Sequence, residues 1–120
     1  MPTKHDSLPD GLSRYREITI SVIGRKTGRT ISNPVWFVFD GNHIFLVPVQ
    51  GTDTQWYKNV LSNPKISIDA RGERADLKAM PIKDPKEVAA IVEKFREKYG
   101  AADIKKYYSK LDVAVRIPLH

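Results

Sequence analysis

Residues 17–47 read EITISVIGRKTGRTISNPVWFVFDGNHIFLV, and they carry the clearest strand and turn signals of the chain. Apolar side chains alternate with hydroxyls so that Ile18, Ile20 and Val22 share one face, the period of a strand with one buried side. GRKTGR then predicts a turn, and ISNPVWFVFD resumes the strand pattern. DGN at residues 40–42 is a strong hairpin signal before HIFLVPV. We therefore expect consecutive strands joined by tight turns.

After residue 51 the apolar spacing changes to that of a helix. The positions that follow this spacing are Trp56, Tyr57, Val60 and Leu61. Thr52 or Thr54 is the expected cap, and SNP at residues 62–64 is the expected stop. This predicts a short amphipathic helix.

The second half of the chain predicts a strand pair, helices and a closing strand. KISIDARG and RADLKAMPI, residues 65–72 and 74–82, read as strands around a glycine turn. Asp84 and Pro85 begin a helix whose apolar stripe is Val88, Ile91, Val92, Phe95 and Tyr99. AADIKKYYSK continues as a second helix, and LDVAVRIPLH alternates as a last strand. Six strands with mostly hairpin connections and two or three helices indicate an α+β fold, an antiparallel barrel or sheet that carries helices.

Composition places the chain among ordinary globular proteins. With 120 residues, 41% hydrophobic and 28% charged, we expect one domain over residues 1–120. No apolar run approaches the length of a membrane span, and the polar start MPTKHDSLPDG lacks the core of a secretory signal, so we expect a cytoplasmic protein. The absence of cysteine excludes disulfides and thiolate chemistry. The net charge of +6 favours an anionic partner.

The turn at residues 24–29 is a candidate anion site. Two glycines after a strand can aim backbone N–H groups and cationic side chains at one point, as a phosphate requires. The candidates are Arg25, Lys26, Thr27 and Arg29. A solvated hairpin turn explains the same residues, and the pattern is neither a Walker loop nor a dinucleotide fingerprint. From the residues alone both interpretations remain open.

Metal, hydrolytic and nucleic-acid functions lack their motifs. His5, His43 and His120 are far apart and form no HxxxH or HExxH pair, so we expect no metal site. There is no nucleophile elbow. The aromatic residues stand mostly in apolar strand contexts without an RNP or helix-turn-helix pattern, so we expect no nucleic-acid partner.

The order TISVIGRKTGRTISNPVWFVFDGNHIFLV and then WYKNVLSNPKISI resembles the deazaflavin (F420)-dependent nitroreductase family. This family lies within the FMN- and F420-binding split β-barrel oxidoreductases, which are pyridoxamine-phosphate-oxidase-like. The resemblance covers about residues 15–72. It implies a six-stranded antiparallel split β-barrel with two to three flanking helices, a homodimer, and coenzyme F420 or FMN as cofactor.

The resemblance also implies cofactor-binding residues. The family's basic turn holds the coenzyme phosphate, which carries over to Arg25, Lys26, Thr27 and Gly28, with Arg29 beside them. The next strand lies along the ring, which carries over to Asn33, Pro34 and Trp36. The short helix contributes Trp56 and Asn59, with Lys58 alongside. We further expect backbone groups near the reactive edge of the ring at Pro48, Val49, Gln50 and Gly51.

The implied activity is hydride transfer from reduced F420 to a small planar acceptor, such as a quinone, a nitroaromatic or an activated enone. No catalytic side chain is obligatory, because the cofactor carries the chemistry. The substrate-side candidates are Trp36, Tyr107 and Tyr108, whose alternative role is packing against the barrel. Many relatives have a proline and an arginine where this chain has Thr30–Ser32. An FMN-dependent oxidoreductase, or a non-catalytic flavin- or haem-binding module, is therefore the alternative.

Overall fold

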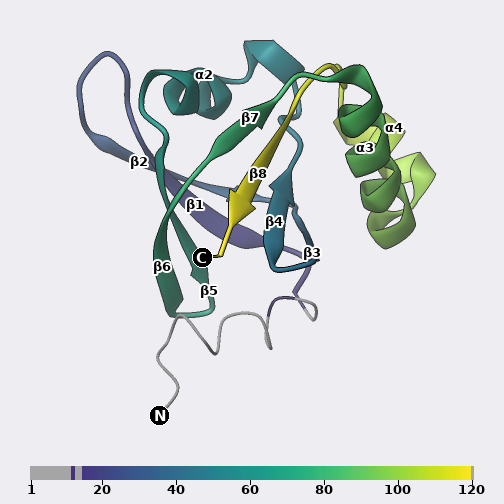
Figure 1. Cartoon of the computed structure of the whole chain (residues 1–120), viewed down its shortest axis with the longest axis horizontal. Helices are drawn as coiled ribbons and strands as arrows, with labels where there is room; N and C mark the ends of the chain where they lie inside the picture. Colours follow the sequence, from purple (N-terminus) through teal and green to yellow (C-terminus); the bar gives the residue numbers. More distant parts are fainter. Residues whose placement is uncertain (1–11, 13–14, 120) are drawn as a thin grey trace.

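The computed structural model describes residue 12 and residues 15–119, which form two four-stranded antiparallel sheets (Figure 1). The first sheet has the order β2-β1-β5-β6, with β1 Ile18–Ile23, β2 Thr30–Val35, β5 Lys65–Ala70 and β6 Glu73–Lys78. The second has the order β3-β4-β8-β7, with β3 Val38–Asp40, β4 His43–Leu46, β7 Met80–Ile82 and β8 Ala114–Pro118. The α+β class is thus confirmed.

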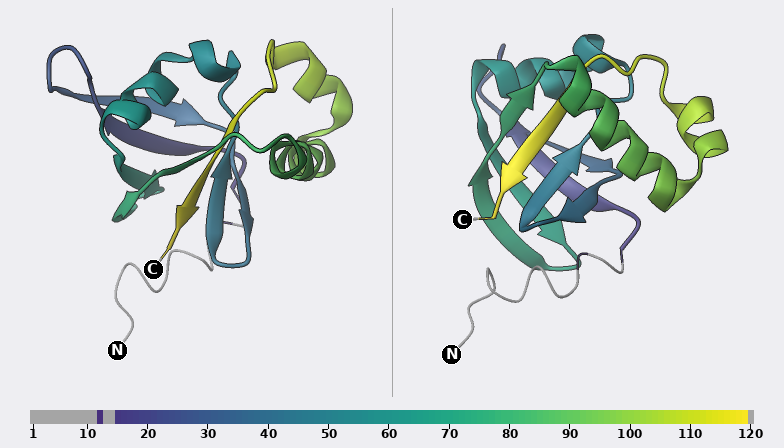
Figure 2. Two further views of the ribbon diagram at one scale, coloured as in Figure 1. Left: turned by 45° about the horizontal axis from the view of Figure 1, so that its top comes forward. Right: turned by 45° about the vertical axis from the view of Figure 1, so that its right-hand side comes forward.

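Three α-helices and one short 3₁₀ helix accompany the sheets in the described part of the chain. They are η1 Gly51–Asp53, α2 Gln55–Ser62, α3 Pro85–Tyr99 and α4 Ala101–Tyr107. Helix α2 packs beside β1, whereas α3 and α4 lie together against the second sheet (Figure 2). None of the helices in this part is long and apolar enough to cross a membrane.

The predicted number of six strands is wrong because two expected strands are divided. ISNPVWFVFD breaks at Trp36 and Phe37 into β2 and β3, and RADLKAMPI breaks at Ala79 into β6 and β7. At each break the chain leaves one sheet and enters the other. The described residues therefore show two sheets connected through these breaks and not a closed six-stranded barrel. Alternation of side chains does not reveal a change of sheet, because each half keeps the strand period.

The hairpin turns follow their predicted chemistry. Gly41 and Asn42 have φ of 58° and 67°, which is the backbone of a type I′ turn, and they join the paired residues Asp40 and His43. The first hairpin pairs Ile18 with Val35 and turns through the basic segment.

Buried side chains form two apolar clusters, one on each side of the second sheet. The first fills the space between the sheets and includes Trp56, Tyr57 and Val60 of α2. The second lies under α3 and α4 and contains the whole predicted stripe of α3. Asp84 caps that helix by accepting from the Glu87 N–H at 3.2 Å. Leu61 departs from the predicted helix face, since 49% of it is exposed.

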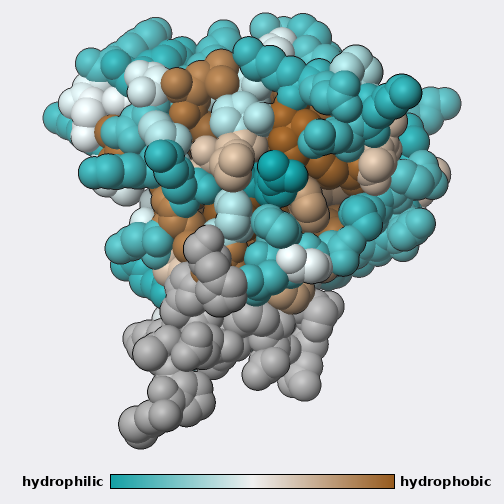
Figure 3. Space-filling model, in the orientation of Figure 1, coloured by the Kyte–Doolittle hydropathy of each residue, from teal (hydrophilic) through white to brown (hydrophobic). Residues whose placement is uncertain are grey.

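Figure 3 shows how apolar residues reach the surface on one face of the molecule. They emerge over α2, over β7 and beside α3, and polar residues separate them. This division into small areas is ordinary for a folded surface.

Candidate cofactor and substrate site

A pocket of about 490 Å³ opens where the two apolar clusters meet. This volume is in the range of small-molecule sites, and the walls are mostly apolar and aromatic. Seven predicted site residues line it: Asn33, Pro34, Trp36, Val49, Trp56, Tyr107 and Tyr108. They come from β2, the β2–β3 break, the segment after β4, the start of α2 and the end of α4. The fold thus brings together residues that are far apart in the chain.

Trp36 is the centre of an aromatic cluster at this pocket. Its ring stacks on Tyr99 with centroids 4.3 Å apart and an interplanar angle of 5°. Tyr107 approaches it edge-on at 5.6 Å, and Tyr108 is tilted at 6.1 Å. The break between β2 and β3 and the C-terminal ends of α3 and α4 therefore supply one continuous aromatic wall.

The two neighbouring tyrosines differ in exposure. Tyr107 is 52% exposed, whereas Tyr108 is 7% exposed and also packs against Phe95. Burial raises the pKa of the Tyr108 hydroxyl, so it keeps its proton at neutral pH. Among the described residues this hydroxyl has no hydrogen-bond partner. Tyr108 is thus a packed side chain that lines the pocket and whose hydroxyl has no partner among the described residues.

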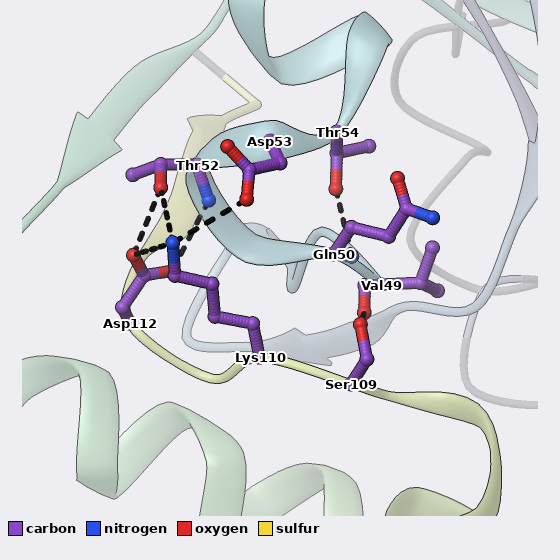
Figure 4. A network of polar contacts seen from close by, with 8 residues as sticks. All are labelled: Val49, Gln50, Thr52, Asp53, Thr54, Ser109, Lys110 and Asp112. Carbon is purple, nitrogen blue, oxygen red and sulfur yellow. Dashed lines mark hydrogen bonds and ion pairs between the residues drawn. The ribbon is translucent and has the colours of Figure 1, made fainter.

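A polar network ties the segment after β4 to the loop after α4 (Figure 4). The Thr52 N–H and hydroxyl donate to the Asp112 carboxylate at 3.1 and 3.0 Å. Lys110 lies 3.5 Å from Asp53 and 3.7 Å from Asp112, and the Ser109 N–H donates to the Val49 carbonyl at 2.8 Å. The network holds the Val49 wall of the pocket beside the wall that carries the two tyrosines.

Three predicted residues of this segment do not line the pocket. They are Pro48, Gln50 and Gly51. The Gln50 N–H donates to the Thr54 hydroxyl at 2.8 Å, and Gly51 has a φ of 56°. A Cβ on Gly51 would lie 2.0 Å from Asp112 Oδ1, so a side chain here would displace the Asp112 carboxylate from Thr52. Their predicted contact with the cofactor ring stays a prediction.

The basic turn closes on itself and binds to α2. The Gly24 N–H donates to the Arg29 carbonyl at 2.7 Å, and the Gly28 N–H donates to the Gly24 carbonyl at 2.9 Å. Arg25 donates from its backbone and from Nη1 to Asn59 Oδ1, at 3.1 and 2.8 Å. Its Nη2 donates to Gln55 Oε1 at 2.8 Å. Arg25 and Asn59, each predicted as a cofactor-binding residue, therefore contact one another within the protein.

The other two cations of the turn, Lys26 and Arg29, have no side-chain partner among the described residues. Lys26 and Arg29 are exposed, and their side chains make no hydrogen bond or ion pair with the described residues. Thr27 Oγ1 accepts from the Arg29 N–H at 3.2 Å, and Lys58 is half-buried on α2. None of these residues lines the pocket. Helix α2 connects the two places, since Trp56 lines the pocket and Asn59 holds the turn.

Sequence reasoning missed five lining residues. They are Glu17, Val35, Val47, Thr54 and Asp103. Thr54 was expected only as a helix cap, and the others belong to no motif. Of the three histidines considered as metal ligands, His43 lies in β4 away from the pocket, while His5 and His120 are outside the described residues.

Solved structures similar to this chain share its fold. One is an F420-H2 dependent reductase, FDR-A, with 20% identity, a TM-score of 0.66, and coverage of 85% of this chain and 93% of that one. A second, described as a domain-swapped dimer, has 20% identity, a TM-score of 0.68, and coverage of 92% and 90%. A third, a Listeria innocua protein described as a pyridoxamine 5′-phosphate oxidase, has 14% identity, a TM-score of 0.69, and coverage of 96% and 92%. At these identities the likeness establishes the fold.

The fold is the one that these solved reductase and oxidase structures share, and it carries a pocket of small-molecule size. The model of the F420H(2)-dependent quinone reductase family matches residues 10–119, and the chain belongs to that family. It is an F420-dependent reductase, which confirms the resemblance and supports coenzyme F420 as the cofactor.

Proposed function

We propose that the pocket and the basic turn form one site for reduced F420 and a small planar acceptor. The ring would lie in the pocket beside Asn33, Pro34 and Trp36, and the phosphate-bearing tail would follow α2 to Lys26 and Arg29. One observation supports this arrangement above all. Helix α2 places Trp56 in the pocket and, one turn later, Asn59 on the backbone N–H and guanidinium of Arg25.

The residues of the site fit an anionic cofactor with a flat ring. Two exposed cations without partners among the described residues suit a phosphate, because charge-assisted hydrogen bonds are the stronger kind. The apolar and aromatic lining suits a planar ring that must be shielded from water. Arg25 acts in this arrangement by fixing the turn on α2.

Reduced F420, when bound, supplies a hydride to the acceptor. The chain binds the tail, limits the orientation of the ring and excludes water through Trp36, Trp56 and Val49. Tyr108 holds its proton at Oη, where it donates a hydrogen bond to an oxygen that gains negative charge. Tyr107 borders the exposed side of the pocket. The acceptor that this wall suits is a quinone, a nitroaromatic or an activated enone.

The cofactor assignment is tested by titration of the protein with oxidised F420 and with FMN, followed by fluorescence. We expect saturable binding of F420 and weaker binding of FMN. Reduced F420 with menadione, and then a nitroaromatic and an enone, tests turnover. Binding without oxidation of the cofactor across this panel supports a non-catalytic module, and failure to bind F420 contradicts the site.

Tyr108→Phe tests the donor role with a matched control. We expect a loss of kcat on the order of a hundredfold with little change in F420 affinity, the range for a positioned donor. Tyr57→Phe is the control, because Tyr57 is fully buried and its hydroxyl has no hydrogen-bond partner among the described residues. Equal kinetics for the two variants would remove Tyr108 from the mechanism.

The predicted split barrel, homodimer and cytoplasmic location remain part of this proposal. The breaks at Trp36–Phe37 and at Ala79, where single strands pass between two sheets, support the split-barrel description. Sedimentation equilibrium tests the dimer, and a monomer at micromolar concentration would contradict it.

A further inference from the structure

The structure points to Tyr99, assisted by Lys98, as a positioning residue that fixes the Trp36 ring in the pocket. We propose that it acts by holding the break between β2 and β3. The consequence for catalysis depends on the proposed function, whereas the orientation of Trp36 does not.

The break leaves buried peptide groups outside both sheets. Phe37 lies between β2 and β3, so its backbone belongs to neither strand pairing. The residue is also fully buried. Its N–H donates to the Tyr99 hydroxyl at 3.0 Å, and its carbonyl accepts from Lys98 Nζ at 2.8 Å. An unpaired buried peptide group destabilises the folded state. Side chains at the end of α3 therefore supply the hydrogen-bond acceptor and donor that the sheets do not offer to Phe37.

The Tyr99 hydroxyl joins a third segment to the break. Its oxygen lies 2.7 Å from the Arg16 carbonyl and 2.8 Å from that of Phe37. Since Lys98 already donates to the Phe37 carbonyl, we assign the hydroxyl proton to Arg16, the shorter contact. Burial keeps this hydroxyl protonated by raising its pKa to about 12. One oxygen thus links the approach to β1 with the β2–β3 break.

The ring of the same residue supports the neighbouring tryptophan. It is parallel to Trp36 at 4.3 Å and therefore covers one face of the indole. The Arg16 guanidinium lies 5.1 Å from the Tyr99 ring centroid and 5.8 Å from that of Trp36. Tyr99 therefore constrains Trp36 twice, through the backbone of the next residue and through the ring face. This leaves the other parts of the indole to line the pocket.

Tyr99→Phe separates these two constraints, because it keeps the ring and removes the oxygen. We would label the ligand-free protein with 5-fluorotryptophan, which gives one ¹⁹F resonance each for Trp36 and Trp56, and assign them with Trp56→Phe. We expect Tyr99→Phe to shift or broaden the Trp36 resonance. The control Tyr57→Phe, which also removes a buried hydroxyl, should leave the Trp36 resonance unchanged.

Kinetics then show whether the orientation matters for the reaction. We expect Tyr99→Phe, which removes the hydrogen bonds to the Phe37 N–H and the Arg16 carbonyl, to raise KM for menadione by at least about threefold to tenfold, the range for one such bond, with a smaller change in kcat. An unchanged Trp36 resonance in folded Tyr99→Phe overturns the proposal. If Tyr99→Phe does not fold, an unchanged Trp36 resonance in Lys98→Met overturns the proposal instead. A shifted resonance in a protein that reduces no acceptor would support the positioning role and contradict only the proposed function.

Discussion

Arg25 and Lys26 are adjacent cations with different surroundings. Arg25 makes three hydrogen bonds to Asn59 and Gln55, whereas the Lys26 side chain contacts no acceptor among the described residues. The Arg25 guanidinium therefore already donates hydrogen bonds within the protein, whereas the Lys26 ammonium is available to a ligand. The sequence alone does not distinguish these two cations, because both are positive side chains in the same turn.

We predict that Lys26→Ala weakens F420 binding by about 1.5 to 3 kcal/mol, the range for hydrogen bonds to charged groups, without a change in unfolding free energy. Arg25→Ala should also destabilise the fold by about 0.5 to 1.5 kcal/mol, the net worth of a hydrogen bond, because it removes the guanidinium donors to Asn59 and Gln55 while the backbone N–H of residue 25 still donates to Asn59. Calorimetric titration and urea unfolding measure the two effects. Unchanged F420 affinity in Lys26→Ala would remove the phosphate assignment.

Lys98 makes stability depend on pH. Burial, with a smaller contribution from Arg16, lowers the pKa of its ammonium group from 10.5 to about 8. Below pH 8 both the folded and the unfolded chain hold the proton, so the cost of burying the charge is fully present. Between about pH 8 and pH 10 the folded chain releases the proton first, and stability rises. Above pH 10 the buried Tyr99 and Tyr108, whose pKa values are raised, oppose this gain because unfolded tyrosines ionise first.

We therefore predict that the melting temperature of the wild type, relative to Lys98→Met, increases from pH 7 to pH 10. The exposed Lys105, replaced in the same way, serves as the control and should show no such trend. Thermal unfolding followed by circular dichroism at each pH measures the difference. A constant difference across this range would show that the Lys98 ammonium is not desolvated in the folded chain.

At the scale of elements, the loops between helices and strands decide the shape of the pocket. The η1 segment and the loop before β8 meet through Thr52, Lys110 and Asp112 (Figure 4). Gly51 permits the observed contact, because a Cβ at this position would push the Asp112 carboxylate away from its place beside Thr52. The pocket therefore depends on a contact between two loops.

We predict that Gly51→Ala destabilises the protein by about 2 to 5 kcal/mol, from the left-handed backbone and the steric clash together. Gly28→Ala is the matched control, since Gly28 also has a positive φ, of 73°, but has open space around its Cα. It should cost only about 1 to 2 kcal/mol. Urea unfolding compares them, and Asp112→Ala should recover part of the Gly51→Ala loss. Equal costs for the two glycine variants would contradict the clash.

At the scale of the whole molecule, the second sheet is shared by both apolar clusters. Residues Ile44 and Leu46 of β4 face the first cluster, while Val38 of β3 and Ala114 of β8 belong to the second. The two clusters therefore pack on opposite faces of the same second sheet. The clusters should therefore lose their packing together.

We predict one cooperative thermal transition that coincides in tryptophan fluorescence and far-ultraviolet circular dichroism. F420 at about a hundred times its Kd should stabilise the folded state by about 2.7 kcal/mol, and FMN at the same concentration should stabilise it less. Two separate transitions would contradict both the shared sheet and the prediction of one domain.

Much of the fold was predictable because its signals are local. The DGN turn, the Asp84 cap and the apolar stripe of α3 each depend on interactions within a few residues. The pocket was predictable in part, through the block order that carries the family resemblance. Glu17, Val47 and Asp103 were not predictable, because their place in the pocket results from packing and not from a motif.

Periodicity, turn chemistry and block order are properties of neighbouring residues, so they were enough to predict most strands and helices, the basic turn and the similarity to F420-dependent reductases. The positions where strands change sheets and the cations that remain free became visible only in the folded chain. Those outcomes depend on contacts across long separations, 34 residues between Arg25 and Asn59 and 62 between Phe37 and Tyr99. Buried backbone groups and charges take whichever partner the packed chain brings within hydrogen-bond distance.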